Sequence, residues 1–134
     1  MACVIWEKEY DLGIPKIDQQ HQRFAATLNK LCDDVEGGLD AIKLVEVLEE
    51  LHEYVNEHLA YEEELFAKFN YEHTKEHVAQ HTIFRKKLKE IQRDFDQGRL
   101  SVMYDAMSFL GKWFVEHVLD QDRKYLDCFH RNGL

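Results

Sequence analysis

Apolar side chains recur along this chain in steps of three and four residues, and the steps predict helices over most of its length. Asp18 begins the first stripe as its predicted N-terminal cap, and Gly37 and Gly38 end it. Ser101 is the predicted cap of the last stripe. The predicted helices cover residues 18–36, 40–69, 72–97 and 101–119.

The segments outside these helices are short. Residues 1–17 form a predicted irregular arm, and residues 120–134 form a C-terminal segment. Four amphipathic helices joined by short loops bring sequence neighbours side by side in opposite directions. The sequence therefore predicts a single all-α domain, an antiparallel up-down-up-down four-helix bundle.

The apolar stripes turn polar at corresponding places. His58 and Glu62 continue the stripe of the second helix, His77 and His81 begin the stripe of the third, and His117 stands on that of the fourth. An unpaired carboxylate or imidazole costs several kcal/mol to bury, so such residues need partners or a metal. We therefore expect them to meet inside the bundle.

The lengths of the hairpins place these residues at one depth. A turn near residues 69–70 sets the His58–Glu62 pair opposite the His77–His81 pair, and a turn near 99 sets the latter opposite a position between His117 and Asp122. The first helix brings His21 to the same level. The predicted metal ligands are His21, His58, Glu62, His77, His81, His117 and Asp122.

Other histidines and glutamates fall outside this set. An inward His73–His77 pair would need a turn inside the apolar run "ELFAKF", so His73 is predicted to be a bystander, as are His52 and His130. Glu63 and Glu64 are rotated roughly 100° and 200° from Glu62 and are expected on the solvated face or behind the ligands.

The spacing between His117 and Asp122 is irregular for a helix. Five residues correspond to about 140° on an ideal α-helix, so both side chains cannot point inward from a regular turn. The fourth helix is therefore predicted to end, widen or kink within "VLDQ".

The types of ligand atom limit which metals can bind. Imidazole nitrogen and carboxylate oxygen without thiolate suit iron, manganese or zinc, and seven ligands are too many for one ion. Two six-coordinate ions offer about twelve positions, of which the side chains fill about nine. An open position suits dioxygen, nitric oxide or azide.

The composition excludes some partners. A net charge of −9 without a basic patch argues against nucleic acid or an anionic membrane. No apolar run approaches the roughly 20 residues of a membrane span, and "MACVIW" is too short for a secretory signal, so we expect a cytoplasmic protein. Cys3, Cys32 and Cys128 are predicted to be reduced thiols.

The segments "WEKEYDLGIPKIDQQH", "HLAYEE", "HTKEHVAQH" and "WFVEHVLDQDRKY" together resemble the haemerythrin family, in particular its single-domain bacterial members, over almost the whole chain. The resemblance implies two iron ions (Fe2+/Fe3+) with an oxo or hydroxo bridge. It implies that His77, His81 and His117 hold one iron, that His21 and His58 hold the other, and that Glu62 and Asp122 bridge them. Dioxygen would bind at the iron with two histidines.

The function that this resemblance implies is reversible oxygen binding for storage, delivery or sensing rather than catalysis. Alternatives are a di-iron enzyme acting on peroxide or nitric oxide, and an iron-donor or stress protein. Phe66 stands where many members of that family have methionine, and we expect this change to alter access to the site or its autoxidation. Apolar residues expected near the ligands, mostly as core packing, are Phe24, Tyr61, Phe84, Trp113, Phe114 and Val118.

Overall fold

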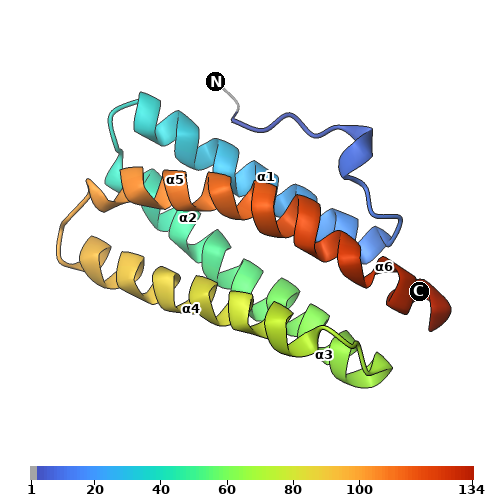
Figure 1. Cartoon of the computed structure of the whole chain (residues 1–134). Helices are drawn as coiled ribbons and strands as arrows, with labels where there is room; N and C mark the ends of the chain where they lie inside the picture. The colour runs from blue at the N-terminus through green and yellow to red at the C-terminus, as the bar shows by residue number, and fades with distance from the viewer. Residues whose placement is uncertain (1–2) are drawn as a thin grey trace.

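The computed structural model describes residues 3–134, so Met1 and Ala2 of the predicted arm lie outside the described residues. Within this range the chain forms four helical rods (Figure 1). In chain order the rods are α1 (Pro15–Glu36); α2 (Ala41–Glu53), the π-helical segment η2 (Tyr54–Leu59) and α3 (Ala60–Phe69); α4 (Thr74–Asp96); and α5 (Val102–Trp113), the π-helical segment η3 (Phe114–Gln121), the 3-10 turn η4 (Asp122–Tyr125) and α6 (Leu126–Arg131).

Each rod packs against its neighbours in the sequence, and the first also packs against the fourth. Contacts join α1 to α2 and α5, and α4 to α3 and α5. Figure 1 shows the same arrangement, with α5 lying along α1 and α4 running beside the second rod. The predicted all-α bundle of four antiparallel helices is confirmed.

The first helix starts earlier than predicted. Ile14 occupies the N-cap position and Pro15 the first helical position, where its missing N–H costs no hydrogen bond. The prediction of Asp18 as the cap is therefore wrong. The Asp18 carboxylate instead accepts hydrogen bonds from the backbone N–H groups of Leu12 at 2.6 Å and Gly13 at 3.1 Å, which ties the arm to the helix.

The second rod ends at the turn that the hairpin argument requires. Asp40 caps its start by accepting hydrogen bonds from the backbone of Ile42 and Lys43. Asn70 ends α3 in the left-handed conformation, with φ of 51°. This turn places the second rod against α4 with the two ligand pairs at one depth.

The fourth rod is longer than predicted. The sequence analysis ended its helix at residue 119, but the rod continues through η3 and η4 to Arg131. Tyr125 and Phe129 keep the apolar stripe going beyond the polar run at 120–124, and both are fully buried. Ser101 stands at the N-cap position of α5 but makes no capping hydrogen bond through its side chain.

The apolar core consists of two clusters. The larger includes Phe24, Phe84 and Trp113, and the smaller includes Phe66 and Tyr125. Along the chain the predicted ligands of each rod fall between a member of one cluster and a member of the other, which for α4 is Tyr71 in the preceding turn. The polar layer therefore lies within the bundle, with apolar packing above and below it.

The N-terminal arm is fastened to α1 by a disulfide. Cys3 and Cys32 are bonded, whereas Cys128 is free and buried. The prediction of three reduced thiols is wrong for two of them, because the arm folds back along α1 and brings distant cysteines together. Two hydrogen bonds between the Val4 backbone and the Asn29 side chain, each 2.7 Å, hold the arm in the same place.

Candidate metal centre

All seven predicted ligands lie together in the polar layer, and every rod contributes at least one. Their exposed fractions are between 0 and 4%. The residues and their elements are His21 on α1; His58 on η2 and Glu62 on α3; His77 and His81 on α4; and His117 on η3 and Asp122 on η4.

The π-helical segment η3 resolves the spacing problem of the fourth rod. A π-helix pairs residues five apart, so His117 and Asp122 both reach the interior. The predicted widening is confirmed. A second π-helical segment, η2, contains His58. It was not predicted, because the four-residue step from His58 to Glu62 already suits an ordinary α-helix.

The two carboxylates lie between the histidines. One oxygen of Asp122, Oδ1, is 3.0 Å from His77 Nε2 and 3.2 Å from His117 Nε2. Its other oxygen, Oδ2, is 3.0 Å from His21 Nε2. Asp122 thus faces two groups of histidines with its two oxygens, which is the disposition of a bridging carboxylate.

Glu62 also serves both groups of histidines. Its Oε1 atom is 3.1 Å from His81 Nε2, 3.7 Å from His77 Nε2 and 3.6 Å from His58 Nε2. Two sets of four residues each offer a group of ligand atoms, and within each set these atoms lie within 4.8 Å of one another. Glu62 belongs to both sets. The sets are Glu62, His77, His81 and His117; and His21, His58, Glu62 and Asp122.

We name the halves of the centre by their histidines: the three-histidine half (His77, His81, His117) and the two-histidine half (His21, His58). The Nε2 atoms of the first half and all four carboxylate oxygens of Glu62 and Asp122 are buried without a well-formed hydrogen bond. Buried polar atoms are normally paired, and unpaired ones are costly. A donor set of nitrogen and oxygen atoms left unpaired at such short distances fits metal cations.

Side chains behind the ligands fix the orientation of three imidazoles. His81 Nδ1 donates to Glu63 at 2.7 Å, and Arg85 holds that glutamate through contacts of 2.7 and 3.2 Å. His117 Nδ1 donates to Gln80 at 2.6 Å, and His58 Nδ1 donates to Gln20. With Nδ1 protonated, each Nε2 directs its lone pair toward the centre, as metal binding requires.

The sequence analysis did not identify Gln20 and Gln80 as partners of the ligand histidines. It placed Glu63 either on the solvated face or behind the ligands. A signal was available: each is the sequence neighbour of a ligand, rotated by about 100° along its helix. Gln20 precedes His21, and Gln80 precedes His81. That rotation turns each side chain toward a ligand on the adjacent rod.

Electrostatics in the metal-free protein favour ionised carboxylates. Burial raises the pKa of Asp122, but His117 and His21 outweigh it and hold this pKa well below its usual range. The pKa of Glu62 is lowered in the same way by its neighbouring histidines, His58, His77 and His81. Burial opposes charge on His77, yet the carboxylates of Asp122 and Glu62 beside its ring favour the protonated form and raise its pKa to about 9. A metal ion would therefore displace a proton from His77 on binding.

The other half behaves differently. Burial lowers the pKa of His58 to about 4, with Glu62 acting in the opposite direction. His58 is therefore neutral at physiological pH and ready to bind a metal without releasing a proton.

Aromatic rings cover the imidazoles. Trp113 stacks on His117 with ring centroids 4.1 Å apart, and Tyr54 stacks on His58 at 5.0 Å. Phe66 meets His77 edge to face at 4.8 Å. These rings form an apolar wall that excludes water from the ligands. Tyr61 is half-buried instead, with the Lys16 ammonium 4.2 Å from its ring centre.

The bystander histidines lie outside both ligand sets. His73 has a side-chain exposure of 58% and is 3.6 Å from Glu72. His52 contacts Gln92 at 2.9 Å, and His130 is exposed. None of the three belongs to either set of candidate ligands within residues 3–134.

Comparison with known proteins agrees with this geometry. The profile of the Hemerythrin HHE cation binding domain matches residues 12–129. A bacteriohemerythrin of Pseudomonas aeruginosa is 31% identical over 128 residues, which is 96% of this chain and 82% of that protein. One from Clostridium acetobutylicum is 31% identical over 131 residues, which is 92% of this chain and 98% of the relative. A hemerythrin-like protein of Naegleria gruberi is 30% identical over 121 residues, 90% of this chain and 88% of the relative. The chain therefore belongs to the haemerythrin family.

Proposed function

We propose that this protein binds dioxygen reversibly at a pair of iron ions. His77, His81 and His117 would hold one iron, His21 and His58 the other, and Glu62 and Asp122 would bridge them. The observation that carries the proposal is the pair of overlapping ligand sets that share Glu62. Bound as Fe2+, the two ions would supply the two electrons that dioxygen takes up.

The unequal number of histidines favours binding at one half. The two-histidine half offers one nitrogen donor fewer than the other, which leaves room for an exogenous ligand. Mostly neutral donors and an apolar wall suit reversible binding, since protons and water near the ligand promote its loss. Phe24, Phe84 and Phe114 belong to the apolar cluster on one side of the ligands.

An optical titration tests the proposal. The iron-loaded protein is reduced anaerobically and exposed to oxygen. We expect a charge-transfer band that disappears on deoxygenation, with about two irons per chain. His58→Ala and Glu62→Ala should abolish the band, whereas the exposed His73→Ala should leave it unchanged. Irreversible bleaching within one oxygen cycle would favour the alternative of an enzyme acting on peroxide or nitric oxide, and failure to retain iron would contradict both.

The cellular location is part of the proposal. Among residues 3–134, no helix is both long enough and apolar enough to cross a membrane. We propose that the protein acts in the cytoplasm. The Cys3–Cys32 disulfide is uncommon for that compartment, so cell fractionation with thiol trapping is the appropriate measurement.

A further inference from the structure

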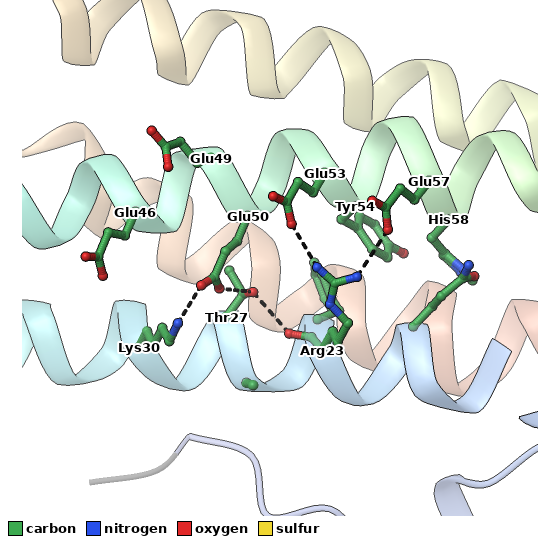
Figure 2. Close-up of a pocket in the computed structure, with 13 residues that line it drawn as sticks. Arg23, Thr27, Lys30, Glu46, Glu49, Glu50, Glu53, Tyr54, Glu57 and His58 are labelled. Atoms are coloured by element: carbon green, nitrogen blue, oxygen red, sulfur yellow. Dashed lines mark hydrogen bonds and ion pairs between the residues drawn. The ribbon is translucent and has the colours of Figure 1, made fainter. Parts of the chain in front are cut away.

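A groove of about 410 Å3 runs between α1 and the second rod (Figure 2). We call it the acidic groove. One wall carries five glutamates of the second rod, and the other carries polar residues of α1. Its charged and polar lining consists of Glu46, Glu49, Glu50, Glu53 and Glu57; Arg23, Thr27 and Lys30; and Gln20 and His58 at the inner end.

The inner end of the groove touches the two-histidine half of the centre. Gln20 and His58 both line it, and they are hydrogen-bonded to each other. The other ring nitrogen of His58 is 3.1 Å from His21 Nε2, in the middle of the ligand set. A molecule that reached this end would therefore lie against Gln20 and against His58, which is itself one of the two histidines of that half.

Arg23 spans the groove next to this inner end. Its guanidinium is 2.8 Å from Glu53 Oε2 and 3.1 Å from Glu57 Oε2. Figure 2 shows Arg23 reaching from α1 to both glutamates, between the Lys30–Glu50 pair and His58. All three side chains are more than half exposed, and exposed ion pairs are weak enough to open readily.

The groove carries a net negative charge. Its five glutamates face two cationic side chains, Arg23 and Lys30. The hydrogen bond to Glu50 raises the pKa of Lys30. Burial raises the pKa of Glu50, but its hydrogen bonds to Lys30 and Thr27 outweigh this effect and lower that pKa, so both groups are ionised. An acidic cleft concentrates cations, repels small anions and leaves uncharged molecules unaffected.

We propose that the acidic groove is the entrance from solvent to the two-histidine half, that the Arg23 bridge to Glu53 and Glu57 closes its inner end, and that its charge admits metal cations and uncharged diatomic molecules in preference to anions. This inference rests on the proposed function, because it assigns the route to the half of the centre that would bind dioxygen. A second groove, of about 400 Å3, reaches His117 of the other half and is lined by Ile83, Phe109 and Trp113.

The rate of azide binding to the oxidised, iron-loaded protein separates the effect of the Arg23 bridge from the effect of the groove's charge. Arg23→Met makes the groove more negative, so charge alone would slow azide, whereas loss of the bridge would speed it. At about 1 M salt, where charges are screened, we expect Arg23→Met to raise the association rate about two- to fivefold. Lys30→Met makes the same change in charge farther from His58 and should leave the rate at this salt concentration unchanged.

Cobalt uptake by the apoprotein tests the charge without dioxygen chemistry. Stopped-flow absorbance would follow Co2+ binding at about 10 mM salt. The double variant Glu46→Gln/Glu49→Gln should bind Co2+ about threefold more slowly and, once loaded with iron, bind azide about threefold faster. Both differences should vanish at about 1 M salt. Asp105→Asn/Asp127→Asn removes two exposed charges outside the groove and should change neither rate.

The outcomes distinguish this inference from the proposed function. If wild-type protein binds Co2+ and azide but Arg23→Met matches Lys30→Met, and the two double variants behave alike, the groove is not the entrance while the di-iron proposal stands. If the apoprotein takes up no metal, the proposed function fails, and this inference fails with it.

Discussion

The three-histidine half and the two-histidine half share both carboxylates but differ in how firmly their imidazoles are held. His81 is fixed by Glu63, which a bidentate Arg85 holds in turn, and His117 is fixed by Gln80. On the other side, His58 has Gln20, and His21 Nδ1 has no hydrogen-bond partner within residues 3–134. Two of the three imidazoles on one side and one of the two on the other thus have such a partner, and the acceptor that an arginine braces, Glu63, lies on the three-histidine side. This firmer support on one side suits the proposed centre, in which the three-histidine half would anchor the metal pair and the two-histidine half would bind the exogenous ligand.

The largest effect should come from a ligand that both halves share. Glu62 belongs to both ligand sets, so Glu62→Ala should lower the metal content of both halves, to well below one ion per chain. His21→Ala should empty only the two-histidine half and leave about one ion per chain. Elemental analysis after gel filtration measures this, with the neighbouring Glu64→Ala as control. Equal metal contents in the two variants would contradict the division into halves.

The two halves should respond to pH in opposite ways in the apoprotein. The pKa of His77 rises from 6.5 to about 9 on folding, so its protonation stabilises the fold. This stabilisation is complete below pH 6.5 and is lost as the pH rises to about 9. The pKa of His58 falls from 6.5 to about 4, so its effect is to reduce stability as the pH falls across that range. Each contribution is about 3 kcal/mol at most.

Urea unfolding of the apoprotein across this pH range is the measurement. Stability should be greatest near pH 6.5 and fall on both sides, with the ionised carboxylates of Glu62 and Asp122 adding to the loss at acid pH. His58→Gln should flatten the decline between about pH 6.5 and 4 and leave the alkaline side unchanged. A decline that persists in this variant would mean that another group is responsible.

Removal of a supporting side chain should weaken metal binding less than removal of a ligand. Glu63→Ala leaves His81 without its acceptor and should reduce metal affinity by about 10- to 100-fold. Gln20→Ala removes a neutral acceptor from His58 and should have a smaller effect. Competition with a chelator measures both affinities. A greater loss from Gln20→Ala would reverse the proposed order of support.

The smallest effect is expected from a histidine outside the centre. His73 is more than half exposed and lies in neither ligand set. His73→Ala should therefore leave metal content unchanged and stability within about 0.5 kcal/mol. Loss of a metal ion from this variant would show that the helix start contributes to the three-histidine half.

The sequence predicts the ligand layer because burial makes polar residues conspicuous there. Imidazoles and carboxylates at apolar stripe positions, combined with hairpin lengths, indicate one depth in the bundle. Asp122 could be included because the hairpin length places it at that depth, although its spacing from His117 then requires a widened helix, which η3 provides. The early start of α1 depends on the tolerance of Pro15 in the first turn, and Asp18 binds the arm instead.

Other features depend on contacts that periodicity does not encode. The pairing of Cys3 with Cys32 requires the arm to fold back along α1, and an irregular arm carries no repeating pattern that gives its path. The partners of His58 and His117 are amides on adjacent rods, and a glutamine beside a ligand is also what an ordinary solvated face would contain.

The disulfide has a consequence for any experiment that reduces the iron. It closes a loop with a sequence separation of 29, which by chain entropy alone is worth about 3–4 kcal/mol. The arm that it holds places Trp6 against Phe114, with ring centroids 6.3 Å apart, and Phe114 stacks on Phe24. Phe24 in turn packs against Tyr54, the ring that covers His58. A thiol reductant would thus loosen the scaffold of the two-histidine half while it reduces the metal. Samples reduced with a dithiol and samples reduced photochemically can therefore differ in the Cys3–Cys32 bond as well as in the metal. The oxidation state of these cysteines should be measured before the two are compared.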